Sequence, residues 1–423
     1  MPRQTGREQH AGRAAAALSS AGLETGLGVC ALLLPPLLAL TPRGAAALAA
    51  IAGLGAAGLV LMRPPRRDAA MRWPASLLAA LLLWGALSAA WSIGPGRSLI
   101  LDARLAGLFA AGLVLSMAAR RIAAPWRLSV FFLAGTGLAV ALALYDLASG
   151  GGLSRYVTVR GFAAPRLNQI AAWLAMLAAP GTALLLGRGR RLLALAAGLV
   201  MAATVVVLAG TAAKVALALS LAVMALICLR RGAVTRVAAA LSIVFILTAP
   251  LTLPRLAPLP RVYAAVDAFK ESAGHRLLIW SFVGDRIAER PFAGWGLDAA
   301  RAIPGGKLEI RPGERWLPLH PHNAALQLWL ELGAPGAALL ALFVGWLWLR
   351  LAAVAWPPLY AAAAGGSLAA ALAVGDASWG VWQEWWIGTL GLALFAILTM
   401  ARAAASPADP TPPPQRDWRG ADR

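Results

Sequence analysis

The chain has 423 residues, of which 60% are hydrophobic and only 13% charged, and its formal net charge is +20 at pH 7. This charge does not indicate nucleic-acid binding, because the Lys and Arg residues occur in short clusters between apolar runs, without interleaved stacking aromatics. Runs of about 20 apolar residues recur along the chain, and a helix needs that length to cross a bilayer. The composition therefore predicts a polytopic membrane protein and excludes nucleic acid as a partner.

The predicted fold class is all-α, with about 12 transmembrane helices and a long periplasmic loop between helices 9 and 10. Residues 1–21 are expected to be a cytoplasmic segment, residues 22–254 to hold helices 1–9, residues 255–322 to form the loop, and residues 323–402 to hold helices 10–12. The Pro-rich tail 403–423 is predicted to be disordered and cytoplasmic. The twelve apolar runs lie near 24–41, 44–62, 74–92, 100–118, 128–147, 168–187, 192–209, 212–229, 237–254, 333–350, 354–374 and 386–402.

Arginine clusters predict the orientation, because cations near membrane ends stay in the cytoplasm. They occur in alternate gaps, for example at Arg63–Arg72 and Arg230–Arg236, so both termini are expected inside. The outer gaps at about 149–167 and 255–322 nevertheless hold many cations: Arg155, Arg160 and Arg166 stand in the first without any Asp or Glu. Such cations suggest an anionic ligand, and the alternative is a solvated surface. Ionisable residues are scarce in the middles of the spans, which disfavours an ion-coupled transporter.

The stretch HPHNAALQLWLELGAPG, residues 320–336, holds two of the four histidines. Asn323, Gln327 and Glu331 are four residues apart and are expected to form a polar stripe on one helical face. Asn323 is the predicted N-cap, and Gly333 is expected to break or kink the helix. His322 is predicted to face water at the membrane rim and to titrate near pH 6 to 7, which suits it to take a proton from a hydroxyl.

Other interpretations of these residues stay open at this point. The main alternative for His320 and His322 is that they are interfacial caps without chemistry; a zinc site with His275 and a pH sensor are weaker alternatives. The tryptophan cluster in GDASWGVWQEWW, residues 375–386, fits either an aromatic belt at the membrane interface or a platform for stacking sugars.

Three motifs resemble the O-antigen ligase and polymerase superfamily of bacterial membrane proteins, over residues of about 160–350. The first is the spacing from His322 and Asn323 to Gly333 and Gly336. The second, in residues 274–301, is an Arg-x-x-x-Trp helix followed by Pro and Gly-x-Gly, and the third is an Asn at the start of a span. Their residues are Arg276, Trp280, Pro291, Gly294, Gly296 and Asn168.

The resemblance implies transfer of a glycan from undecaprenyl diphosphate to a sugar hydroxyl of lipid A-core, on the periplasmic face of the bacterial inner membrane. This is an enzyme activity independent of metal and nucleotide, with no cofactor. The implied partners are the carrier-linked glycan donor, a lipid A-core or glycan acceptor, and membrane lipids. The alternatives are an O-antigen or exopolysaccharide polymerase and, from another class, a non-catalytic polysaccharide or lipid transporter.

The same resemblance implies roles for particular residues. His322 is expected to act as general base and Arg276 to hold the diphosphate. Lys214 stands where the family commonly has an arginine, so either Lys214 contacts the diphosphate or Arg160 or Arg166 does. The expected substrate-binding set is completed by Asn168, His320, Asn323 and Glu331.

Overall fold

The fold is given by a computed structural model in which residues 3–64, 71–157 and 164–406 are described, with side chains from residue 19 onward. The helices that make up the membrane bundle are α1 (Arg3–Leu40), α2 (Gly44–Met62), α3 (Arg72–Ser88), α4 (Pro95–Ala119), α5 (Pro125–Ala148), α7 (Asn168–Gly187), α8 (Arg191–Val207), α9 (Thr211–Thr252), α12 (Ala324–Ala353), α13 (Pro358–Gly375) and α14 (Glu384–Ala405). Short helical turns precede α7, namely α6 (Ser154–Val157) and η2 (Ala164–Leu167).

In the described part of the chain, nine helices are long and apolar enough to cross a membrane. The all-α polytopic class is thereby confirmed. Two expected spans, 212–229 and 237–254, both lie in α9, whose two helical parts meet at a kink where the backbone of Arg230 is not helical. The helices α3 and α8 have 17 residues each and do not count among the nine. The number of twelve crossings therefore stays a prediction.

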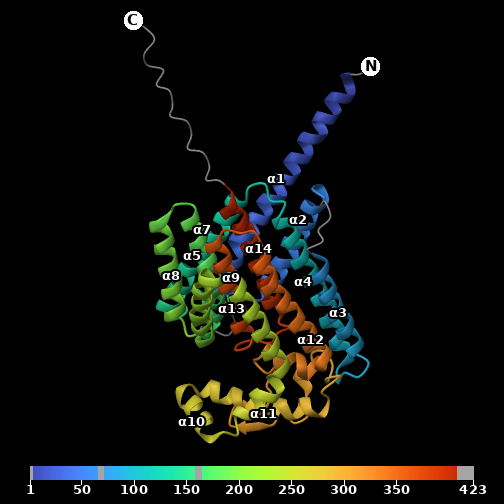
Figure 1. Cartoon of the computed structure of the whole chain (residues 1–423), viewed down its shortest axis with the longest axis vertical. Coiled ribbons are helices and arrows are strands. Elements are labelled where there is room, and N and C mark those ends of the chain that lie inside the picture. The colour runs from blue at the N-terminus through green and yellow to red at the C-terminus, as the bar shows by residue number, and fades with distance from the viewer. Residues whose placement is uncertain (1–2, 65–70, 158–163, 407–423) are drawn as a thin grey trace.

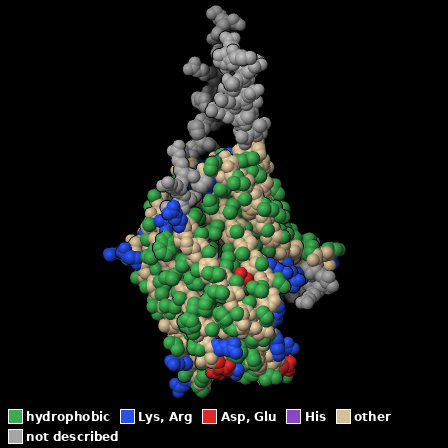
Figure 2. All heavy atoms as spheres, turned by 90° about the vertical axis from the view of Figure 1, so that its right-hand side faces the viewer, with side chains coloured by type: hydrophobic (Ala, Val, Ile, Leu, Met, Phe, Trp, Pro, Cys, Tyr) green, Lys and Arg blue, Asp and Glu red, His purple; other side chains and the backbone are tan. Residues whose placement is uncertain are grey.

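The bundle has two distinct ends. The start of α1 and the end of α14 lie at one of them, and α10 and α11 lie at the other (Figure 1). Figure 2 shows hydrophobic side chains over the middle of one face, with Lys and Arg gathered mainly toward the end that carries α10 and α11. An apolar belt between charged ends is what a bilayer requires of a surface that contacts lipid.

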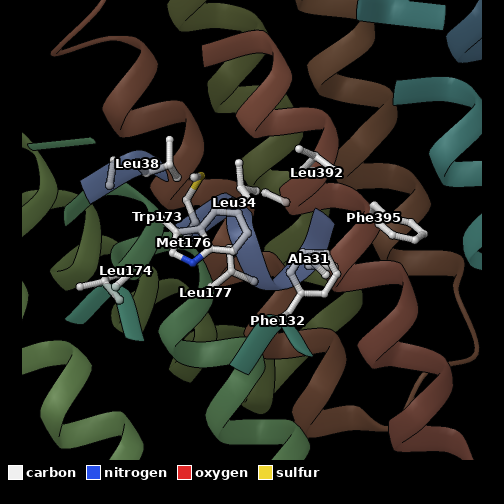
Figure 3. Packing of buried hydrophobic residues seen from close by; sticks show 14 of the residues in the cluster. Ala31, Leu34, Leu38, Phe132, Trp173, Leu174, Met176, Leu177, Leu392 and Phe395 are labelled. Atoms are coloured by element: carbon white, nitrogen blue, oxygen red, sulfur yellow. The ribbon is translucent and has the colours of Figure 1, made fainter. Parts of the chain in front are cut away.

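The largest cluster of buried side chains joins α1, α5, α7 and α14 (Figure 3). Trp173 of α7 is fully buried and stacks on Phe132 of α5 with ring centroids 6.3 Å apart. Its indole N–H donates to the hydroxyl of Thr136 at 3.0 Å, so the polar end of this ring is satisfied inside the bundle. Close packing of this kind holds helices together where lipid is as apolar as the side chains.

The segment predicted as a long loop contains structure of its own. It holds η3 (Leu253–Leu256), α10 (Pro260–Phe269), α11 (Glu271–Glu289) and η4 (Ala299–Ala302), and the antiparallel strands β1 (Glu309–Arg311) and β2 (Glu314–Arg315). A ring nitrogen of His275 lies 2.8 Å from the backbone oxygen of Arg315, which joins this hairpin to α11. The segment can therefore hold side chains in fixed positions.

Candidate functional site

The first turn of α12 is capped twice. Asn323 has an extended backbone, and its side-chain oxygen accepts the N–H of Leu326 at 2.9 Å, so the predicted N-cap is confirmed. The carboxylate of Asp376 accepts the N–H of Ala325 at 3.2 Å, while the Asn323 amide donates to the Asp376 backbone oxygen at 3.1 Å. The chain after α13 thus fixes the start of α12.

A break in α12 occurs at Gly333, as predicted, where φ is +63°. The carbonyl groups that lose their helical partners accept other donors: Leu330 from Trp295 N–H at 2.9 Å, Glu331 from Gly296 N–H at 2.8 Å, and Leu332 from the indole N–H of Trp84 at 2.8 Å. An irregular backbone inside a membrane bundle needs such partners. The Gly-x-Gly loop after α11 therefore docks on the break in α12.

The carboxylate of Glu331 is completely buried and accepts hydrogen bonds from three elements. It receives the backbone N–H of Asp298 at 2.8 Å, the indole N–H of Trp382 at 2.7 Å and the side-chain amide of Gln327 at 3.1 Å. The predicted polar stripe thus exists. Because Glu331 joins the loop before η4 to the segment before α14, its position favours a supporting function over direct contact with a substrate.

His322 is held in an unusual backbone conformation with a fixed ring. Its φ is +57°, in the left-handed region that non-glycine residues rarely adopt. The backbone N–H of His322 donates to Nδ1 of His320 at 3.2 Å, and the rings have centroids 4.3 Å apart. Nδ1 of His322 lies 2.5 Å from the backbone oxygen of Ser378, which only accepts hydrogen bonds. A neutral His322 therefore carries its proton on Nδ1 and leaves the Nε2 lone pair available to a substrate.

The two histidines are weaker bases than the sequence suggests. Burial lowers the pKa of His322 to about 4, with the charges of Arg276 and His275 acting in the same direction and the hydrogen bond to Ser378 opposing them. Burial, followed by the charge of His322, lowers the pKa of His320 to about 3. The expectation that His322 titrates near pH 6 to 7 while facing water is wrong, because its half-buried ring lies among cationic groups.

The helix α11 brings Arg276 to the histidine segment. The indole N–H of Trp280 donates to the backbone oxygen of Pro321 at 3.0 Å, so one turn of α11 holds the peptide between the two histidines. The charge of Arg276, one turn earlier, acts on both His320 and His322. Burial lowers the pKa of the Arg276 guanidinium, but an arginine stays charged at neutral pH. The structure thus places Arg276 and His322, the two residues with the main expected roles, near enough for the charge of one to act on the other.

The remaining expected residues do not form one group. Lys214 lies in the first turn of α9, where the side-chain oxygen of Asn168 lies against Gly210 and Lys270 donates to Thr211 at 2.7 Å. Arg166, by contrast, lines a cavity near His320. Arg160 lies outside the described residues. The choice between Lys214, Arg160 and Arg166 as a second diphosphate ligand therefore stays open.

An open cavity of about 1230 Å³ lies beside the histidine segment. His320 lines it, whereas His322 and Arg276 are not among its lining residues. The sequence analysis missed Arg43 and Arg97, because it applied the charge rule to the long outer gaps and not to the short ones. Other lining residues that were not expected in a site are Arg104, Gln169, Asp298, Gln383 and Glu384. The lining residues Trp379, Trp382 and Trp385 belong to the tryptophan cluster that was offered as a platform for stacking sugars, and Arg301 belongs to the outer cations for which an anionic ligand was suggested.

Metal binding finds no support in the geometry. Among the residues that the structure describes, no group of three or more His, Cys, Asp or Glu side chains is arranged to hold a metal ion. His275 contacts Arg315 and lies 3.8 Å from Glu314, in place of joining the histidine pair in a ligand set.

The fold and the site define a polytopic all-α membrane protein with a histidine pair and a basic cavity outside the middles of its spans. Residues 197–341 match the family model described as O-antigen ligase. With the relatives below, this match shows that this region of the chain is similar to the O-antigen ligase-like superfamily. The matched region includes α11, the Gly-x-Gly loop, the histidine segment and the break in α12.

Curated relatives agree with this family. The chain is 37% identical over 126 residues to a protein of Rickettsia conorii whose name marks it as a candidate polysaccharide ligase, and 38% identical over 125 residues to one of Rickettsia prowazekii with the same designation. These matches cover 29% and 28% of this chain and 30% of each relative. The similarity therefore spans less than a third of the relatives' length.

Proposed function

We propose that the chain is a membrane glycosyltransferase of the O-antigen ligase type. It transfers a glycan from undecaprenyl diphosphate to a sugar hydroxyl of lipid A-core, on the periplasmic face of a bacterial inner membrane. The observation that carries this proposal is the ring of His322, whose Nδ1–H donates to the backbone oxygen of Ser378 and whose Nε2 has no hydrogen-bond partner among the described residues. The adjacent positive charge of Arg276 supplies the group that a diphosphate requires.

The proposed reaction has one bond formed and one broken. The acceptor hydroxyl oxygen attacks the anomeric carbon of the donor sugar, and its proton moves to Nε2 of His322. The bond from that carbon to the diphosphate oxygen breaks, and undecaprenyl diphosphate leaves with the electron pair. Arg276 stabilises the negative charge that develops on this leaving group, because a guanidinium can donate two parallel hydrogen bonds to phosphate oxygens.

Reconstitution in vesicles with a defined undecaprenyl diphosphate glycan tests the proposal. One set of vesicles also contains lipid A-core, a second contains another carrier-linked glycan, and a third is prepared with the glycan donor on one side only. We expect glycan on the core lipid. Longer carrier-linked chains would instead identify a polymerase, and movement of unchanged donor across the bilayer would identify a transporter.

A further inference from the structure

The cavity beside the histidine segment is strongly basic. Five arginines from four separate elements or turns line it against two acidic side chains, and none of the five comes from α11. The arginines are Arg43, Arg97, Arg104, Arg166 and Arg301, and the acids are Asp298 and Glu384. Cations on the outer ends of spans run against the usual charge distribution of membrane proteins, which suggests that they have an anionic ligand.

Both acids are already paired. Glu384 accepts from Arg104 at 2.9 Å, and Asp298 from Arg301 at 2.8 Å. Arg43 and Arg97 are exposed to the cavity and form no ion pair with any described residue. Two guanidinium groups are therefore available for an anion, and each can bind a phosphate or carboxylate through two parallel hydrogen bonds.

These arginines differ from the group assigned to the donor. Arg276 comes from α11 and is not part of the cavity lining. His320 experiences the charges of both Arg276 and the cavity residue Arg301. The histidine pair therefore has cationic groups on two separate elements, α11 and η4. A transferase that joins two glycans needs one subsite for the donor and one for the acceptor, and the two cationic groups fit this requirement.

The rest of the lining suits a carbohydrate. Trp379 and Trp385 meet edge to face with ring centroids 4.7 Å apart, and both line the cavity. The side-chain amides of Gln169 and Gln383 add donors and acceptors for hydroxyl groups, whereas that of Gln327 is already bonded to Glu331 and to the backbone of Val381. Aromatic faces bind the apolar faces of sugar rings, and the volume exceeds that of a typical small-molecule pocket of about 300–1,000 Å³.

We propose that this cavity is the acceptor subsite and that it selects a glycan acceptor with anionic substituents, held by Arg43 and Arg97 with its ring against Trp379 and Trp385. The inference rests on the proposed function. It adds that the acceptor is anionic. A guanidinium can bind a phosphate or a carboxylate group on the sugar in the same way. The experiment therefore tests the two groups separately.

The test compares acceptors in the transfer assay with wild type and the double variant Arg43→Gln/Arg97→Gln. The acceptors are intact lipid A-core, the same lipid after phosphatase treatment, and the same lipid with its carboxylates reduced. For the double variant we expect the KM of the intact acceptor to rise about tenfold while the KM of the donor stays unchanged, which corresponds to about 1.4 kcal/mol. One of the two treatments removes the anion that the arginines bind. For the acceptor treated in this way, we expect nearly the same KM with wild type and with the double variant. Arg261→Gln, at an exposed arginine of α10 outside the cavity, should behave as wild type.

Binding of lipid A-core to the detergent-solubilised protein, measured without donor, separates this inference from the proposed function. Weaker binding of intact core lipid by the double variant supports the anionic subsite even if no transfer occurs. A rise in the donor KM would overturn the inference and assign the cavity to the diphosphate. Equal losses with charged and fully neutralised acceptors would overturn it as well, because they would show a structural effect.

Discussion

The indole N–H of Trp280 donates to the backbone oxygen of Pro321 at 3.0 Å, so the helix that carries Arg276 also holds the peptide that carries His322. Trp280→Phe removes this donor and keeps the aromatic ring. We expect kcat to fall about tenfold, because small displacements of a general base cost much activity. Transfer rates in vesicles measure the effect. Trp316→Phe is the matched control, since that ring stacks on Phe282 but donates to no described residue; an equal loss there would contradict a specific function of Trp280.

The low pKa of His322 predicts an unusual pH profile. The neutral ring is the base, so activity should persist as pH falls below 6 and be lost as pH falls through about 4. A bound diphosphate adds negative charge near Arg276, which raises the pKa of the ring, so the acid limb of kcat should lie at higher pH than that of kcat/KM. Initial rates from about pH 3.5 to about pH 8, with recovery after return to neutral pH, test this. His322→Ala should abolish transfer and leave membrane insertion intact; full activity would refute the general-base assignment.

Gly333 is expected to tolerate no side chain. Its φ is +63°, and a Cβ atom there would overlap the backbone oxygen of Phe292. Gly333→Ala should therefore separate the Gly-x-Gly loop from α12, with a large fall in unfolding temperature and no transfer. Gly313→Ala isolates the backbone strain alone, because Gly313 has φ +81° and open space around it. We expect a cost of about 1–2 kcal/mol for this control, and similar losses in both variants would show that contact with the loop is unimportant.

Glu331→Gln tests the buried carboxylate. Four donors face its two oxygens, and a glutamine side chain replaces one acceptor with an N–H group that points at a donor. We expect a loss of about 1–3 kcal/mol in stability, together with lower transfer activity. Thermal unfolding in detergent measures the first effect. Glu289→Gln, in an exposed pair with Arg286, should change the unfolding temperature little.

Local features of the fold were predictable because they depend on residues close in the chain. The apolar runs predicted the spans, Asn323 predicted the cap, and Gly333 predicted the break in α12. The helix lengths were less predictable, because α9 continues through two expected spans. The break in α9 at Arg230 falls in the cationic gap that was expected between these two spans.

The partners of the site residues were not predictable, since they come from distant segments. Asp376 and Ser378 lie more than 50 positions after the residues that they contact, at separations of 51 and 56 along the chain. The pKa of His322 depends on the same contacts and on burial, which explains why the ordinary value for histidine was misleading. Arg43 precedes α2 and Arg97 lies in the first turn of α4, and only the packing of the helices brings them to one cavity.

The cavity has a consequence for the length of the glycans involved. Its lining comes from turns and helix ends and from residues such as Leu319 and Gly380 beside the histidines, and it is open to the outside. A space of about 1230 Å³ holds only a few sugar rings at once, so the distal part of a long polymer stays outside it. As the proposed acceptor subsite, the cavity would contact only the few sugars next to the acceptor hydroxyl, and the rest of the acceptor glycan would not affect its binding there.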